Sequence, residues 1–481
     1  MSISNSLSNA LSGMTAASRM AEVVSSNLAN SLTDGYGRRT LNLSSAVIGG
    51  RGAGVEIGGI TRHVDRGILS DRRLADASLG GFGSLVQTMG QIEDIVGRAG
   101  ETGSISAKIV AVESALIDAA SDPSSIIRLS TLGTRLDNLA QGLNDASSQI
   151  QTLRVEADTS IADQVDRLNA ALRQVEQLNG DITYSKNTGG DPSSLYDQRQ
   201  QVIDQIAEIV PVRELQRDGG QVALMTPTGE TLIDGAPKQF GFVPNTVVTA
   251  DMTLASGGLS SITFDGAPIG ADGIGKLSGG SLGAAFQARD GDLIAAQDNL
   301  DSIAADLMVR FQDPAVDPTL SAGQPGLLTD NGNAFDIANV TGLAGRLSLN
   351  AAVNPEQGGA ITNLRDGVNA TSPGPSGNAS LLQSLSAALS APRAGVGDPT
   401  QASAAGRAAS FEAVIGTQRL DYESELSFAN ARWTSLKEAE TAGGVDSDYE
   451  MQMLLRVEQA YAANARVVQA VETMMQRLME I

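Results

Sequence analysis

The sequence contains no cysteine and a single histidine, and aromatic residues make up only 3% of its 481 residues. Without cysteine the chain has no disulfide framework, no thiolate nucleophile and no cysteine-based zinc or iron–sulfur site. With His63 as the sole histidine, neither a transition-metal centre nor a Ser-His-Asp triad is indicated. The shortage of aromatic side chains indicates cores of Ala, Leu, Ile and Val, which suits long helices better than a compact enzyme.

Basic charge is also scarce. The 33 Lys and Arg residues stand against 55 Asp and Glu, which gives a formal net charge of −22 at pH 7. Because binding to nucleic acid or to an anionic membrane surface requires clustered Lys and Arg, we expect neither partner. No run of 18 apolar residues is present, so no transmembrane helix is expected. The first 20 residues have no basic region or continuous apolar segment, and we expect no cleaved secretory signal.

Two short motifs suggest site chemistry at first sight and fail on inspection. The glycine-rich stretch GGRGAGVEIGG, residues 49–59, does not have the register of a phosphate-binding loop, and glycine turns between two strands explain it better. The stretch DNGNAFD, residues 330–336, lacks the closing glutamate of a calcium loop. We therefore expect no catalytic residue, no metal site and no cofactor.

Both ends of the chain carry a heptad-like apolar pattern, with spacings that alternate between three and four residues as in a coiled-coil seam. The seam residues of the N-terminal end are Ile3, Leu7, Ala10, Met14, Ala17, Ala21, Val24 and Leu28. The seam residues of the C-terminal end are Leu454, Val457, Tyr461, Asn464, Val468, Val471, Met475 and Leu478.

Such helices are marginally stable in water unless their apolar face is covered. We therefore expect the two ends to pack on each other, on neighbouring subunits, or both. The alternative is that each end covers an ordinary globular core, and periodicity alone leaves that open. Asn464 is polar at a seam position, and we expect it to fix the register of the pair.

The central region begins with a long helical stretch. Residues 74–209 read almost wholly as helix, and no proline lies between Ser124 and Asp191. That length predicts a helix of about 55 residues, roughly 80 Å long at 1.5 Å per residue. Its apolar seam runs from Leu129 to Leu153 and continues in a shifted phase from Ile161.

Beyond the long helix the period changes. From Pro211 the chain alternates like β-strands between Pro-x-Gly, Asp-Gly and Gly-Gly turns, then returns to helix over 279–312. Residues 313–399 are irregular, with a strand expected in AGRLSLNAAV and a helix in NASLLQSLSAALSA. A further helix is expected over 402–441.

Together these patterns predict an elongated, multidomain α+β fold. Long N- and C-terminal helices pair in a coiled-coil-like rod, and a mainly β domain is inserted in the middle. The expected domains are a terminal helical assembly domain (1–35 and 445–481), a helical rod domain (36–209, 277–313 and 400–444) with a β-hairpin region near 40–65, and a mainly β outer domain (210–276 and 314–399).

Four stretches carry a resemblance to a known family. SNALSGMTAASRMAEVVSSNLANSLTDGYGRR is similar to the N-terminal signature of axial flagellar proteins, in which an Ala-Asn pair precedes Gly-Tyr. Here these residues are Ala29, Asn30, Gly35 and Tyr36, and we interpret them as a hinge where the terminal helix leaves the rod. The signature marks the axial class and not one member of it.

The other stretches narrow the resemblance to the first flagellar hook-associated protein family, the subunits between hook and filament. They are GVEIGGITRHVDRGILSDRR, the C-terminal YEMQMLLRVEQAYAANARVVQAVETMMQRLMEI, and the most discriminating, GDPSSLYDQRQQVIDQIAEIVPVRELQRDGGQVALMTPTGETLIDG. The chain departs from the family pattern at Asp34, where proline is usual, and at 445–447, where it reads Val-Asp-Ser in place of Asn-Leu-Asp.

The resemblance implies a structural, non-enzymatic subunit of the extracellular flagellum. It also implies export of the unfolded chain from the cytoplasm by the flagellar type III apparatus. The implied partners are further copies of the chain in a ring or tube, the hook protein, a second junction protein on the filament side and an export chaperone. Two alternatives stay open: a surface-exposed, adhesin-like binding module, and another axial protein such as a flagellin or a hook subunit. The helix at Leu195–Arg199 followed by a β module argues against the second alternative.

Overall fold

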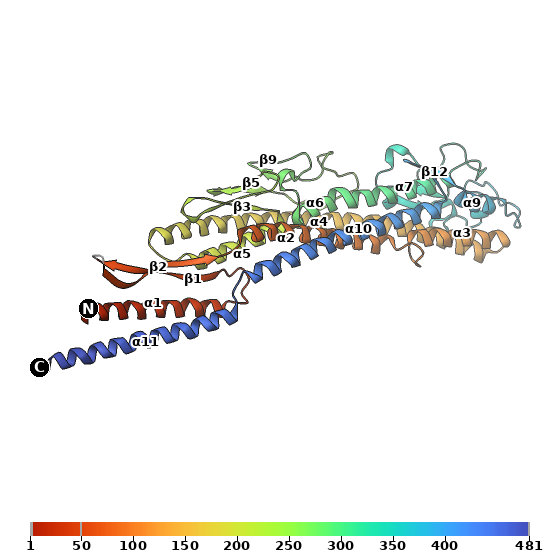
Figure 1. Ribbon diagram of the computed structural model, residues 1–481. Coiled ribbons are helices and arrows are strands. Elements are labelled where there is room, and N and C mark those ends of the chain that lie inside the picture. The colour runs from red at the N-terminus through yellow and green to blue at the C-terminus, as the bar shows by residue number, and fades with distance from the viewer. Residues whose placement is uncertain (1–2, 49–50, 480–481) are drawn as a thin grey trace.

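The protein, seen in a computed structural model that describes residues 3–48 and 51–479, is elongated (Figure 1). At one end lie the two terminal helices, α1 (Ile3–Ala29) and α11 (Ser447–Met479), with a hairpin of β1 (Arg38–Ile48) and β2 (Arg51–His63) beside them. Long helices run from there to the opposite end, which we call the far end. The expected elongated α+β fold with paired terminal helices is confirmed.

The spine of the molecule is α4 (Ile126–Asn187), a single helix of 62 residues. At 1.5 Å per residue it is roughly 90 Å long. Ser125 caps its start by accepting the Arg128 amide, and the chain turns at Gly189, whose φ is 77°. The expected long helix is therefore present, and it carries two separate apolar cores.

The near core surrounds the second half of α4, from Ile161 to Leu178. The helices that flank it are α2 (Arg66–Val96), α5 (Ser193–Ile209) and α6 (Gly280–Gln287). Two small antiparallel sheets complete it. The first contains β3 (Arg213–Gln216), β4 (Val222–Met225), β5 (Thr231–Asp234) and β6 (Ala236–Pro237), and the second β7 (Phe240–Gly241), β8 (Thr263–Phe264) and β9 (Ala267–Pro268).

The far core surrounds the first half of α4, from Leu129 to Ile150. Its helices are the C-terminal part of α2, α3 (Ile105–Ser121), α7 (Leu293–Phe311), α9 (Ser380–Ser390) and the first part of α10 (Ala404–Ala442), with the short α8 (Asn363–Asp366) beside them. Two strand pairs lie here: β10 (Leu328–Asp330) with β11 (Leu347–Leu349), and β12 (Arg393–Gly395) with β13 (Asp398–Ala402). The strand and the helix expected within 313–399 are both present.

The two halves of the expected outer domain join different cores. Residues from 210–276 pack into the near core, whereas residues from 314–399 pack into the far core. The shift in the phase of the apolar seam has a physical counterpart here, because the buried polar residues Arg154 and Asp158 lie on α4 between the two cores. The division into three domains itself stays a prediction.

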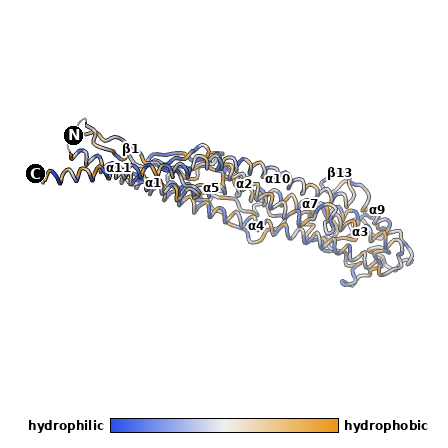
Figure 2. Tube along the Cα trace, turned by 60° about the horizontal axis from the view of Figure 1, so that its bottom comes forward, coloured by the Kyte–Doolittle hydropathy of each residue, from blue (hydrophilic) through white to orange (hydrophobic). Residues whose placement is uncertain are grey.

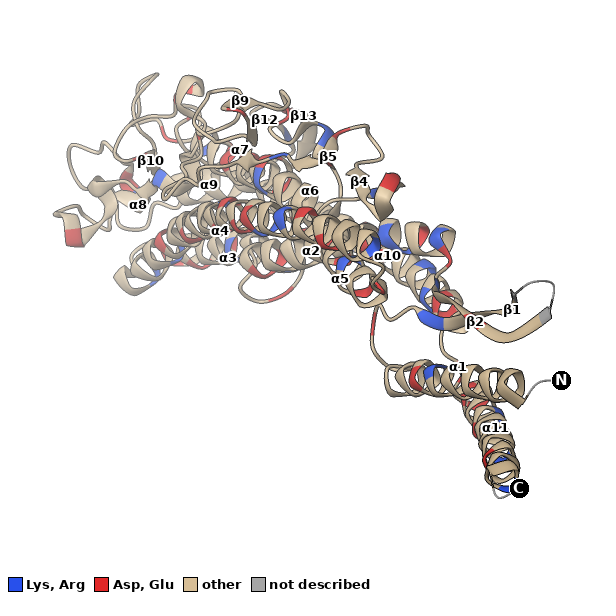
Figure 3. Ribbon diagram, turned by 90° about the vertical axis from the view of Figure 1, so that its left-hand side faces the viewer, with Lys and Arg blue, Asp and Glu red and all other residues tan. Residues whose placement is uncertain are grey.

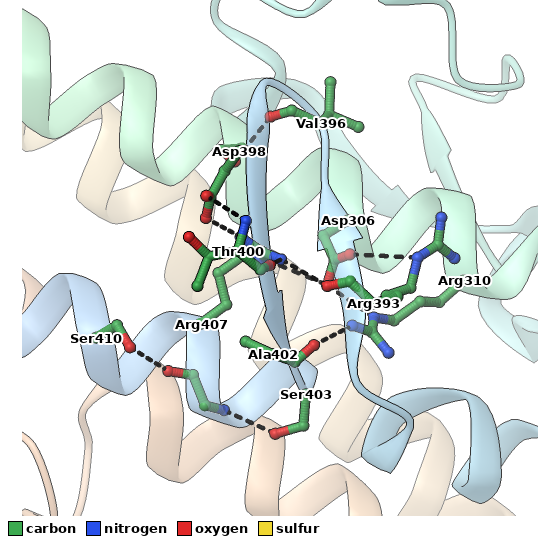
Figure 4. A network of polar contacts seen from close by, with 12 residues as sticks. Asp306, Arg310, Arg393, Val396, Asp398, Thr400, Ala402, Ser403, Arg407 and Ser410 are labelled. Carbon is green, nitrogen blue, oxygen red and sulfur yellow. Dashed lines mark hydrogen bonds and ion pairs between the residues drawn. The ribbon is translucent and has the colours of Figure 1, made fainter.

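Buried ion pairs hold the irregular far end in place (Figure 4). Asp306, on α7, accepts a hydrogen bond from Arg310 Nε at 2.7 Å. The side chains of Arg393 and Arg407 lie within 4 Å of the same carboxylate. Arg310 also donates to the carbonyl of Ala402, at 2.9 Å. Because each buried charge has partners, the β12–β13 hairpin is fixed to α7 without an apolar core of its own.

Candidate functional site: the terminal helix pair and its joint to the rod

The two terminal helices pack against each other along their length. Five seam residues are buried: Ala10, Ala17, Val24, Val457 and Val471. Those that are half-buried are Ile3, Leu7, Met14, Ala21, Leu28, Leu454, Asn464 and Val468. Three others, towards the C-terminal end, stay exposed: Tyr461 at 45%, Met475 at 46% and Leu478 at 61%. The structure thus brings the N- and C-terminal seams together and leaves part of the second one uncovered.

Asn464 lies directly against Gly13 of α1. A Cβ atom added at Gly13 would stand 2.8 Å from the Asn464 side-chain nitrogen, which is closer than side chains tolerate. The Asn464 amide donates to the carbonyl of Ala460 one turn earlier, at 2.9 Å. Within the described residues its hydrogen bond stays inside α11 and its contact with α1 is this close approach to Gly13, so a role in fixing the register stays a prediction.

The opposite face of α1, which is mostly small and polar, lies on the hairpin. Ser12 Oγ accepts the Val55 amide at 3.1 Å. Gly54, with φ of 97°, brings the strand so close that a Cβ there would lie 2.1 Å from Ser12 Oγ. Ala16 and Val23 are buried on the same face. A helix with two covered faces packs between α11 on one side and β1–β2 on the other.

The proposed hinge residues lie in the turn that follows α1. Ala29 ends the helix, and Asn30 donates its side-chain amide to the Ser26 carbonyl at 2.9 Å. Gly35 has φ of 79°, a conformation that other residues rarely adopt. The Tyr36 hydroxyl reaches back to α1 and donates to Asn27 Oδ1 at 2.9 Å. Partial burial raises the pKa of Tyr36, so the hydroxyl stays protonated and can donate.

Asn27, in the last turn of α1, connects the helix to the hairpin, a role that we did not predict from the sequence. None of its surface is exposed (0%). Its side chain donates to the Arg39 carbonyl at 2.8 Å and accepts the Arg39 amide at 3.0 Å. An asparagine side chain can pair with a backbone in both directions as a neighbouring strand would. Asn27 therefore fixes α1 to the first strand of the hairpin.

Asp197 fixes the hairpin in turn to the rod. This residue of the Leu195–Arg199 motif, on α5, accepts three hydrogen bonds from the joint. The donors are the Gly37 amide at 3.0 Å, Arg62 Nε at 2.7 Å and Arg39 Nη2 at 2.6 Å. The Arg39 guanidinium also lies over the Tyr36 ring, 4.8 Å from its centroid. The most discriminating stretch of the sequence thus contacts the N-terminal signature across 158 residues of chain.

A second set of ion pairs ties the returning chain to the joint. Arg38 donates to Glu450 at 2.8 Å, and Glu450, near the start of α11, is buried. Lys437 of α10 pairs with Asp34 at 2.9 Å, and this ammonium group lowers the pKa of the Asp34 carboxyl. At the position where the family usually has proline, this chain therefore has an ion pair to α10.

The adjacent rod is held by two buried arginines of α2. Arg72 lies within 2.7 Å of carboxylate oxygens of Asp76, Asp204 and Glu440, and Arg73 pairs with Asp204. Since these carboxylates come from α2, α5 and α10, the network closes the end of the rod to which the hairpin is attached. Figure 3 shows ribbon segments of Lys and Arg, in blue, and of Asp and Glu, in red, near the end of the rod where α5, α10 and β2 meet.

The chemistry of the site is that of attachment. In the described part of the chain no group of three His, Asp or Glu side chains could hold a metal ion. His63 lies at the hairpin base, with its Nε2 2.8 Å from Thr40 Oγ1. None of the helices that the structure describes is long and apolar enough to cross a membrane. What the site does is join two helices, a hairpin and a rod by buried hydrogen bonds and ion pairs.

Comparison with known proteins places both parts of this site. Residues 7–36 match the model of the flagella basal body rod protein, and residues 89–315 match that of the helical domain of flagellar hook-associated protein FlgK. The first match covers most of α1 and the turn up to Tyr36, and the second covers α4 and α5 in full.

Among relatives, flagellar hook-associated protein 1 of Escherichia coli is 24% identical over 359 residues, which is 70% of this chain and 63% of the relative. The protein of the same name from Salmonella typhimurium is 26% identical over 263 residues, 53% of this chain and 47% of the relative. The alignments thus span between about half and two thirds of these relatives' length.

Among solved structures, the flagellar hook junction protein FlgK from Burkholderia pseudomallei aligns with a TM-score of 0.45 and 20% identity, over 55% of this chain and 47% of the other. The assignment depends instead on the sequence matches, which join the axial signature at 7–36 to the helical domain at 89–315. On those matches, and on the relatives that share them, this chain is similar to flagellar hook-associated proteins of the FlgK family over its N-terminal signature and its helical domain.

Proposed function

We propose that this protein is a structural subunit of the bacterial flagellum that joins the hook to the filament. In this proposal the chain is exported unfolded by the flagellar type III apparatus and works outside the cell. It polymerises through its terminal helices into a ring or tube. Its neighbours are further copies of itself, the hook protein on one side and a second junction protein on the other, and an export chaperone holds it in the cytoplasm beforehand.

The observation that carries the proposal is the uncovered apolar surface of the terminal pair. Along α11, large apolar side chains that α1 does not cover include Met451, Leu455, Met474, Leu478 and Met479. Figure 2 shows apolar positions recurring along this helix up to its free end. Large exposed apolar side chains that recur along one helix indicate a site of protein association, and a tubular assembly would bury them against neighbouring copies.

The test is to make the exposed face polar without disturbing the pair. Leu455 and Leu478 are 57% and 61% exposed, so Leu455→Ser with Leu478→Ser should leave the folded monomer unchanged. In cells that lack the natural protein, the doubly substituted chain should be exported, but the cells should carry hooks without filaments and release flagellin into the medium.

A matched control is Ile127→Ser, since Ile127 is an exposed apolar residue at the far end of the rod. Cells with this variant should swim, and immunogold labelling should find the protein at the boundary between hook and filament. Filaments of normal number in cells with the doubly substituted protein would contradict the proposed role of the α11 face.

A further inference from the structure

A pocket of about 300 Å³ lies beside the joint, between β2, the start of α2, α5 and β3. Its lining is unusually basic for a chain with a net charge of −22. Four arginines line it and only one acidic residue does: Arg62, Arg66, Arg73, Arg199 and Glu214. Arg62 also attaches the hairpin through Asp197, whereas Arg66 and Arg199 take no part in that attachment.

Arg73 lines the pocket with part of its hydrogen-bonding capacity unused. Its side chain is 2% exposed, and it pairs with Asp204 and with Glu214 through Nε and Nη1. Its Nη2 is buried and has no acceptor in the described part of the protein. A buried guanidinium nitrogen without an acceptor costs free energy, which an incoming acceptor would recover.

Arg199 is buried as well, and no carboxylate of the described residues lies within ion-pair distance of it. Its Nη1 donates to Asn179 Oδ1 and to the Gly220 carbonyl, both at 2.8 Å. The guanidinium lies over the Tyr196 ring, 5.2 Å from the centroid. Burial lowers the pKa of Arg199, while the more distant Glu214 acts in the opposite direction. The positive charge is thus held in place by neutral groups.

Arg66, the first residue of α2, is the accessible member of the group. It is exposed, and among the described residues its side chain makes no hydrogen bond and no ion pair. Asp65, the preceding residue, caps α2 by accepting the Gly67 and Ile68 amides, so its carboxylate is already engaged. The side chain of Arg66 is therefore free to close over a ligand in the pocket.

We propose that this pocket binds an oxyanion, either a phosphate-type ion or a carboxylate. Guanidinium groups form short, charge-assisted and often bidentate hydrogen bonds with both, and a cluster of four from three elements supplies them from several directions. The anion could be free in solution, or it could be an acidic side chain of a second copy of this strongly acidic chain. The two sources share one chemistry and differ in whether occupation requires association.

Inorganic phosphate is the probe, titrated into the full-length protein at constant ionic strength with chloride as the replaced anion. Binding should saturate and raise the melting temperature of the natural protein. Arg66→Gln should weaken it about three- to fivefold, the range for one exposed charge contact, and Arg66→Glu should weaken it further. Arg135→Gln, at an exposed arginine of α4 with no ion pair in the described structure, is the matched control and should bind as the natural protein does.

Sedimentation of the same proteins shows whether the anion comes from solution or from a second copy of the chain. If phosphate binds and leaves the sedimentation of the natural protein unchanged, the ligand is a free anion. If the protein self-associates, and both phosphate and Arg66→Glu reduce that association, the pocket receives a carboxylate from a second copy. Phosphate binding that is equal in the natural protein and Arg66→Glu, or absent from both together with unchanged association, would overturn the proposal.

Discussion

Replacement of Asp197 by alanine should release the joint from the rod while leaving both cores intact. The change removes one carboxylate that accepts from Gly37, Arg39 and Arg62 at 2.6 to 3.0 Å. Loss of one partner of a buried pair costs about 3–5 kcal/mol. Arg62 keeps the Gln200 side chain and the Gly35 carbonyl as acceptors, so we expect the low end, about 3 kcal/mol.

The assay is hydrogen exchange at the backbone amide of Arg39. This amide donates to Asn27 and not to Asp197, so it reports opening of the whole joint and not merely one lost bond. A loss of about 3 kcal/mol should accelerate its exchange roughly 150-fold, because each 1.36 kcal/mol is a factor of ten. Amides in the middle of α4 should exchange as before.

The matched control for Asp197 is Asp234→Ala. Asp234 also pairs with an arginine, Arg217, but both side chains are 46% exposed, and solvent screening leaves such surface pairs with little effect on stability. The control should leave the Arg39 amide unchanged. If Asp197→Ala alters exchange at Arg39 by less than twofold, Asp197 does not hold the joint and the reasoning fails.

Two further predictions concern other parts of the chain. Alanine normally stabilises a helix by up to about 1 kcal/mol relative to glycine, but Gly13→Ala would press on Asn464. It should therefore speed amide exchange in α1, and Asn464→Ala should reverse the effect; slower exchange in Gly13→Ala alone would contradict the packing. Burial raises the pKa of Asp301 from 3.8 to about 6, although Gly342 and Ala344 donate to it. The unfolded chain then loses this proton first, so stability falls by roughly 3 kcal/mol between pH 4 and 6 and is flat above. The urea midpoint should fall more over that range than in Asp301→Asn, and an equal fall would exclude Asp301 as the cause.

The helices were the most predictable part of the molecule, because their signal is local. The apolar seam from Leu129 onward and the absence of proline are enough to predict α4, because apolar positions on one face of a helix recur with its period of about 3.6 residues, whichever element covers that face. The period also predicts that α1 and α11 each need a partner for a narrow apolar stripe, and their pairing with each other is one of the arrangements that it left open. Period cannot show that α1 has a second covered face, because Ser12 and Ala16 are small or polar and read as solvent-facing.

The position of the joint could be predicted from the sequence, but the residues that hold it together could not. The signature located the turn through Ala29, Asn30, Gly35 and Tyr36, yet the buried residue that organises it is Asn27. An asparagine in a helix reads as a weak, solvated position until its partner is known, and the partner here is the backbone of Arg39 twelve residues later. The signal available was the tyrosine nine residues after it, whose hydroxyl needs an acceptor once it is partly buried.

The order of attachment has a mechanical consequence. The rod holds the hairpin through Asp197, the hairpin holds α1 through Asn27, and α1 in turn packs on α11. Neither of the two apolar cores includes a residue of α1 or α11. The direction of the terminal pair relative to the rod is therefore set by polar contacts at the hairpin base and not by core packing. Hydrogen bonds and ion pairs of this kind fix geometry while contributing modest net stability. We therefore expect substitutions at the joint to change the direction of the terminal helices while leaving both cores undisturbed.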